Sequence, residues 1–167
     1  MDEIDVRAKP LTFNGPIEAG LRAVALLGAA FPGCYDLQRQ TALDYLLVNT
    51  GQLGGPEDLH PSSPIRTPAT EVRRKIILDA LHLMMTRELV VRRTAEDGIH
   101  YCAGEATAMF LDSLRTPYIC RLKERANWLV HHLAAYSDKD FYELMHQFFD
   151  NWVIEFQHAE QSLGVDS

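Results

Sequence analysis

Apolar residues recur at helical spacing in the first part of the chain. Between Pro16 and Pro32 they return every three or four positions, as they do on the buried face of an α-helix. Proline suits the first turn of a helix, and a second proline followed by glycine ends it. Another helix is predicted over 37–50, with Asp36 as its N-cap. The pattern therefore predicts two core helices before residue 51.

Residues 51–69 contain four of the eight prolines and predict an unusually long loop. A third helix is predicted from Thr67–Pro68 to residue 88, because helical spacing resumes after a favourable first turn. Its predicted buried stripe consists of Val72, Ile76, Ala80, Leu81 and Met84. Leu78 and Met85 lie away from that stripe, so a second apolar face is expected, which is a candidate partner-binding surface.

The segment 89–102, LVVRRTAEDGIHYC, changes from helical spacing to alternation. Two β-type runs flank an Asp97–Gly98 turn, which is typical of a β-hairpin. Arg92 and Arg93 are neighbours on the first strand, so we expect their side chains on opposite faces. Two interpretations of the hairpin are considered: a wing that contacts DNA, or a clip within a subunit that holds other proteins.

Three further helices are predicted after the hairpin. The first covers 105–114, the second begins at Thr116–Pro117, and the third covers 141–157 behind a cap at Ser137–Asp140. Three helices followed by a hairpin are typical of a winged helix. The predicted fold class is therefore mainly α, with a winged-helix-like domain (three helices plus a β-hairpin wing) followed by C-terminal helices. A DNA-reading helix-turn-helix joins its last two helices by about three or four residues, whereas the loop at 51–69 is far longer.

The predicted organisation has four parts. They are an N-terminal arm at 1–12, the winged-helix-like domain at 13–115 with its Pro/Gly-rich loop at 51–69, a C-terminal helical pair at 116–157, and a polar tail at 158–167. No internal repeat or low-complexity tract interrupts them.

The composition is that of a globular protein, with 47% apolar and 23% charged residues in a chain of 167. No apolar run approaches the roughly 20 residues that a membrane span requires, so we expect a cytoplasmic protein without a membrane partner. Cys34, Cys102 and Cys120 form no CxxC pair, which suits a reducing compartment. Cys102 and Cys120 are interpreted as small buried residues rather than reactive thiols.

Charge is unevenly distributed along the chain. The net charge is -7, yet residues 66–93 carry seven basic and three acidic groups. Any nucleic-acid contact must therefore be local. The candidate nucleic-acid-binding residues are Arg73, Arg74, Lys75, Arg92 and Arg93. The alternative interpretation is a solvated helix face whose arginines pair with nearby acids.

No catalytic constellation is found in the sequence. Phosphate-binding glycine motifs, HExxH and Cys/His clusters are all missing from it. His131 and His132 are neighbours on a predicted helix, so their side chains point about 100° apart and cannot hold one ion. We therefore expect no catalytic residue, no cofactor and no metal site.

The last predicted helix is unusually aromatic. Phe141, Phe148, Trp152 and Phe156 lie on one stripe, which Phe149 broadens. Two interpretations remain open and are compatible: packing against the preceding helix of the same chain, or docking of a partner through aromatic anchors.

Three strings resemble one known family. They are FNGPIEAGLRAVALLGAAFP, LLVNTGQLGGPEDLHPSSPIR, and RRKIILDALHLMMTRELVVRRTAEDGIHYCAGEATAMFLDSL. They are similar to the middle component of bacterial ABC-three-component systems, the Lamassu-type defence operons, over roughly residues 13–156. The most distinctive part is the loop, and the resemblance implies a shaped contact element formed by Gly54, Gly55, Pro56, His60 and Pro61.

The resemblance implies a non-catalytic adaptor or regulatory subunit. In such systems it bridges an SMC-like ATPase, which senses foreign DNA, and an effector subunit that is often a nuclease, in defence against phage and plasmids. Double-stranded DNA is a further expected partner, reached through the complex. The alternative from the residues alone is a free-standing winged-helix transcription regulator.

Overall fold

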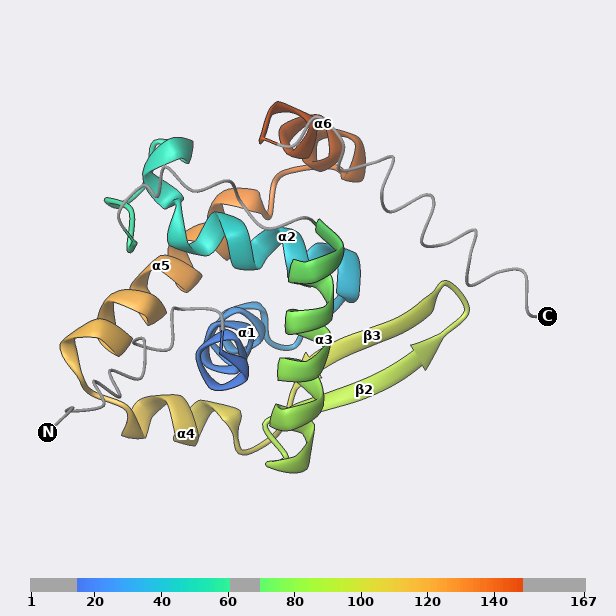
Figure 1. Ribbon diagram of the computed structural model, residues 1–167, viewed down its shortest axis with the longest axis vertical. Helices are drawn as coiled ribbons and strands as arrows, with labels where there is room; N and C mark the ends of the chain where they lie inside the picture. The colour runs from blue at the N-terminus through green and yellow to red at the C-terminus, as the bar shows by residue number, and fades with distance from the viewer. Residues whose placement is uncertain (1–14, 61–69, 149–167) are drawn as a thin grey trace, which may run out of the picture.

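The computed structural model describes residues 15–60 and 70–148, whose arrangement is shown in Figure 1. The elements in chain order are α1 (Pro16–Ala30), β1 (Cys34–Asp36), α2 (Leu37–Val48), the 3-10 helix η1 (Thr50–Leu53), α3 (Thr70–Thr86), β2 (Val90–Ala95), β3 (Gly98–Ala103), α4 (Thr107–Ser113), α5 (Pro117–Leu133) and α6 (Asp138–Phe148). The predicted class, a mainly helical protein with a β-hairpin wing, is confirmed.

Several helices begin where their predicted caps lie. The Asp36 carboxylate accepts a backbone N–H of α2 at 2.7 Å, and the Thr116 hydroxyl accepts one of α5 at 3.3 Å. The Ser137 hydroxyl accepts a backbone N–H of α6 at 3.1 Å. Each cap satisfies a donor that the first turn of a helix leaves unpaired. The predicted start of α3 at Thr67–Pro68 lies outside the described residues.

Helix α1 lies at the centre of the fold. Figure 1 shows it nearly end-on, with α2, α3, α4 and α5 around it. One buried cluster joins α1 to α2, α5 and α6, and a second joins it to α3 and the hairpin. The neighbouring side chains Leu26 and Leu27 are both fully buried, and only Leu27 reaches the second cluster. α1 therefore connects the α5–α6 side of the protein to the wing side.

The buried face of α3 is rotated relative to the prediction. Ile77, Leu81 and Met84 are buried in the second cluster, but Val72 is 52% exposed and Ile76 is only partly buried. At 3.6 residues per turn, Val72 lies on the opposite side of the helix from Leu81, which is on the buried face of α3. The prediction that Val72 is buried was wrong.

A short strand that the sequence did not reveal completes the sheet. β1 pairs antiparallel with β3, and β3 pairs with β2, so the strand order is β1-β3-β2. In this register Cys34 lies directly opposite Cys102, and the two are joined by a disulfide. The interpretation of Cys102 as a simple buried thiol was therefore wrong, although its side chain is buried. Cys120, also expected to be buried, is a free and exposed cysteine.

The two ends of the hairpin meet at one carbonyl group. The carbonyl oxygen of Leu89 accepts the backbone N–H of Gly104 at 3.1 Å and the hydroxyl of Thr107 at 2.7 Å. A side chain at residue 104 would collide with the carbonyl oxygen of Glu88, so glycine is required at this close approach. These contacts fix the base of the wing between the end of α3 and the start of α4.

Candidate functional site

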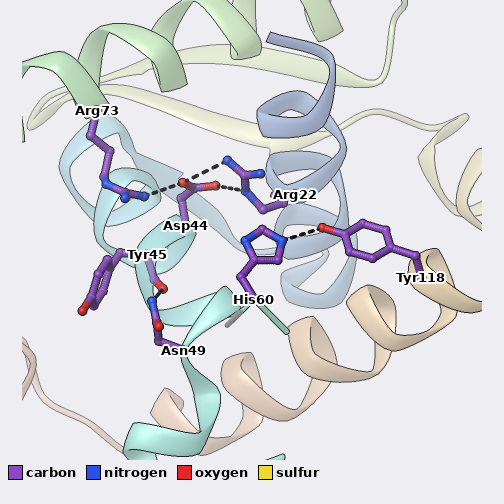
Figure 2. A network of polar contacts seen from close by, with 7 residues as sticks. All are labelled: Arg22, Asp44, Tyr45, Asn49, His60, Arg73 and Tyr118. Carbon is purple, nitrogen blue, oxygen red and sulfur yellow. Dashed lines mark hydrogen bonds and ion pairs between the residues drawn. The ribbon is translucent and has the colours of Figure 1, made fainter. Parts of the chain in front are cut away.

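A buried ion-pair network joins α1, α2 and α3 (Figure 2). The Asp44 carboxylate on α2 accepts Arg22 Nε of α1 at 2.6 Å and an Arg73 nitrogen of α3 at 3.0 Å. The side chains of Arg22 and Asp44 are only 4% and 2% exposed. A buried carboxylate is costly unless positive hydrogen-bond donors surround it. Asp44 and its two arginines therefore fix the relative positions of three helices.

Arg73 belongs to this network and is turned away from the predicted basic patch. Its side chain is 14% exposed, and its guanidinium lies over the Tyr45 ring at 5.4 Å. Arg74 is half-buried on another side of α3, and Lys75 is exposed on a third. Successive helical residues point about 100° apart. The structure thus separates three residues that the sequence grouped together.

His60 is turned into the protein rather than toward a partner. Its Nε2 lies 2.8 Å from the hydroxyl of Tyr118 on α5, and Figure 2 shows the two side chains pointing toward each other beside Arg22. Burial and, to a smaller extent, the nearby positive charge of Arg22 together lower the pKa of His60 to about 4. The imidazole is therefore neutral at pH 7 and connects the loop to α5.

The rest of the loop before residue 61 is also held against α5. The backbone at Gly55 lies on the indole of Trp128, so closely that an added Cβ would come within 2.5 Å of the ring. The Arg125 guanidinium donates to the carbonyl oxygen of Glu57 at 2.8 Å, and the Thr50 hydroxyl donates to that of Pro56 at 2.8 Å.

Glycine is required again where η1 ends. Gly54 has a φ of 76° there, a conformation that favours glycine, and it is exposed. Pro61, the last residue of the predicted contact element, lies outside the described residues. Gly54 therefore stands at the solvent edge of a loop whose neighbouring residues are fixed to α5.

The wing presents two different faces. The β2–β3 register places Arg92 opposite Tyr101 and Arg93 opposite His100. Because side chains alternate along a strand, Arg92 and Arg93 point to opposite faces, and both are exposed. The Arg93 face also carries the hydrogen bond between His100 Nε2 and the Asp97 carboxylate, at 2.9 Å.

A cavity of about 420 Å³ lies beside the Arg93 face of the wing. Its lining includes three carboxylates, those of Asp36, Asp97 and Asp138, and the single guanidinium of Arg39. Phosphate would meet negative charge there. The Arg92 face is the one that packs toward α3.

Comparison with known proteins identifies the family. A family model described as "ABC-three component (ABC-3C) system Middle Component 2" matches residues 12–155. The chain belongs to this family. No curated protein and no solved structure matches it. Membership implies that this middle component works with partner subunits.

In this middle component, α6 packs mainly within its own chain. Phe141 and Met145 are buried against α2 and α5, and the Arg39 guanidinium lies 3.8 Å from the Phe141 ring centre. Phe148 is half-buried, with its ring 6.4 Å from that of Tyr45. Internal packing, one of the two open interpretations, thus accounts for the described part of the aromatic stripe.

The other predicted partner-binding residues divide between described and undescribed parts. Phe149, Trp152 and Phe156 lie outside the described residues. Leu78 and Met85 are partly buried at the edge of the second cluster, so α3 offers less free apolar surface than predicted.

Sequence reasoning missed the residues that organise this middle component. Arg22 and Asp44 are each a single charge inside an apolar run, GLRAVALL and ALDYLL, and such isolated charges were the available signal. Nothing in the sequence pointed to Tyr118 or Trp128 as the loop's contacts. His131 is exposed, and His132 stacks on Trp128 at 4.6 Å, so the two histidines diverge as predicted.

Over residues 15–60 and 70–148, no group of three or more His, Cys, Asp or Glu side chains is placed to hold a metal ion. In the same ranges, the helices are too short or too polar to cross a bilayer.

Proposed function

We propose that this middle component is a non-catalytic, cytoplasmic adaptor in a Lamassu-type defence system against phage and plasmids. It bridges an SMC-like ATPase and an effector, which is often a nuclease. Family membership over residues 12–155 carries the proposal. The buried network supports it, because Asp44 and its arginines serve packing between helices rather than chemistry on a substrate.

The loop at residues 51–60 is the proposed partner contact. Its backbone is held by Trp128 and Arg125 of α5, and its His60 side chain by Tyr118. Gln52, Gly54 and Glu57 remain exposed. A surface that is already ordered loses little conformational entropy when a partner binds. The fixed loop therefore suits repeated docking of the same subunit.

The complex is further proposed to contact double-stranded DNA through the wing. The wing projects from the helical body in Figure 1, and Arg92 is exposed on the face of the wing that looks toward α3. Exposed arginine side chains are common donors to the phosphates of DNA.

A free-standing transcription regulator receives less support. The exposed side of α3 carries Glu71 and Asp79 beside Lys75, so a phosphate-lined major groove would meet carboxylates. The adaptor is therefore the function that the structure favours.

Co-expression with the proteins encoded beside it tests the adaptor proposal. The full chain should elute with both on size-exclusion chromatography. Glu57→Arg should weaken that co-elution, because it reverses an exposed charge on the loop. Glu105→Arg is the matched control, since Glu105 is equally charged and exposed but lies beside α4. An ATPase and effector that assemble fully without this chain would overturn the proposal.

A further inference from the structure

Three side chains from different elements converge where α3 meets the wing. Tyr101 of β3 lies directly opposite Arg92 of β2, so the two side chains stand on the same face of the hairpin. Tyr101 belongs to the second buried cluster, together with Ile77 and Leu81 of α3. This face of the hairpin therefore looks toward α3.

Arg74 points toward the same place. It lies three and seven residues before Ile77 and Leu81, so it shares their side of the helix and continues it toward solvent. The other candidate arginines are turned elsewhere: Arg73 binds Asp44, and Arg93 stands on the opposite face of the wing.

The Tyr101 side chain is buried, and its hydroxyl has no hydrogen-bond partner within residues 15–60 and 70–148. Tyr101 is 4% exposed. Burial raises the pKa of Tyr101, and the positive charges of Arg92 and Arg74 lower it. Both guanidiniums therefore act on this one hydroxyl, which is a donor available to an anion.

We infer that Arg74, Arg92 and the Tyr101 hydroxyl form a binding site for the backbone phosphates of double-stranded DNA, independent of base sequence. The two guanidiniums supply charge and paired N–H donors, which fit phosphate oxygens. The hydroxyl donates one further hydrogen bond. Contacts to phosphate position a protein on DNA without selecting bases.

The surroundings favour DNA over an acidic protein segment. The site lies on a projecting hairpin, the shape that can follow a duplex surface (Figure 1). The cavity lined by Asp36, Asp97 and Asp138 is beside the opposite face, where these carboxylates disfavour phosphate. A duplex would thus approach from the Arg92 side.

This inference rests on the DNA contact in the proposed function and is independent of the adaptor role. Co-elution with partner subunits tests the adaptor role, and DNA affinity tests the site. Loss of DNA binding with intact assembly therefore affects only the site, and loss of assembly with intact DNA binding affects only the adaptor role.

The test is fluorescence anisotropy of the full chain with a labelled duplex of arbitrary sequence, at several salt concentrations. Arg92→Gln and Arg74→Gln should each weaken binding about tenfold and reduce the salt slope by about one. Tyr101→Phe should weaken binding about threefold to tenfold through the lost hydrogen bond. Arg93→Gln, the matched control on the opposite face, should stay within about twofold.

Several results would overturn the inference. They are no duplex binding by the wild-type chain at low salt, an Arg93→Gln effect equal to that of Arg92→Gln, or displacement of the duplex by inorganic phosphate at matched ionic strength. Tighter binding of polyglutamate with the same arginine dependence would instead indicate an acidic protein partner. Arg92 is exposed, so Arg92→Gln should keep the wild-type circular dichroism spectrum and melting temperature.

Discussion

Arg73 donates to the Asp44 carboxylate at 3.0 Å across the interface between α3 and α2. The same carboxylate accepts Arg22 of α1 at 2.6 Å. One acidic side chain therefore binds two arginines from two other helices. A residue that counts toward a basic surface patch in the sequence is part of the interior in the folded protein.

Replacement of Asp44 should destabilise the fold strongly. Asp44→Ala leaves two guanidiniums without their carboxylate, one of them almost fully buried, and we expect a loss of about 3–5 kcal/mol in the free energy of unfolding. Urea denaturation followed by circular dichroism measures it. Asp79→Ala is the control, because Asp79 is exposed and should change stability by less than about 0.5 kcal/mol. Equal effects of the two changes would contradict the network.

Stability should fall in mild acid because of His60. Its pKa is lowered from 6.5 to about 4, so the unfolded chain binds a proton more readily than the folded one in this interval. The contribution of neutral His60 to the free energy of unfolding is fully present above about pH 6.5 and is lost as the pH falls toward 4. Because His60 is only partly buried, the loss should be about 1–3 kcal/mol.

Unfolding free energies of the wild type and His60→Gln across this pH range test that expectation. The free energy of unfolding of the variant should depend less on pH, because the variant lacks the imidazole that titrates in this range. The carboxylates titrate in both proteins and contribute equally to the two slopes. Identical slopes would mean that His60 is not held in its neutral form.

The contact between Gly55 and Trp128 should tolerate no added methyl group. An added Cβ at residue 55 would lie 2.5 Å from the indole, so Gly55→Ala should cost about 1–3 kcal/mol of stability. A double-mutant cycle with Trp128→Ala isolates the contact. The Gly55→Ala penalty should shrink in the Trp128→Ala background, and an unchanged penalty would rule out the indole as its cause.

Packing of α6 on its own chain predicts a large cost for truncating its buried face. Met145 is fully buried, so Met145→Ala should lower the free energy of unfolding by about 2–5 kcal/mol. The exposed neighbour His146 is the control, and His146→Ala should change it by less than about 0.5 kcal/mol. A Met145→Ala variant as stable as the wild type would show that α6 does not pack on α2 and α5.

The disulfide gives a prediction by mass spectrometry. Denatured protein treated with iodoacetamide in the absence of reductant should gain one label, on Cys120, and three labels after reduction. Disulfides are rare in a reducing cytosol, so the experiment should be done on protein purified both with and without a thiol reductant. Three labels under every condition would show that Cys34 and Cys102 remain thiols.

Local signals in the sequence predicted most of the elements. Prolines at helix starts, the cap at Asp36 and the Asp97–Gly98 turn act over a few residues, and the structure contains the helices and hairpin that they predict. β1 was missed because three residues carry too little pattern, and its pairing with β3 depends on residues far away in the chain.

The candidate site was less predictable because it depends on helix packing. Arg73, Arg74 and Lys75 are adjacent in the sequence, but only the position of α2 determines that Arg73 meets Asp44. Similarly, Tyr101 was recognised only as a strand residue, and its place beside Arg92 and Arg74 follows from the register and the approach of α3.

The base of the wing has a mechanical consequence. Both ends of the hairpin are tied to the carbonyl oxygen of Leu89, by Gly104 and by Thr107. With its base closed in this way, we expect the hairpin to move as one rigid unit. A pull on its tip is therefore delivered to the end of α3 and the start of α4, and through them to α1 at the centre of the fold.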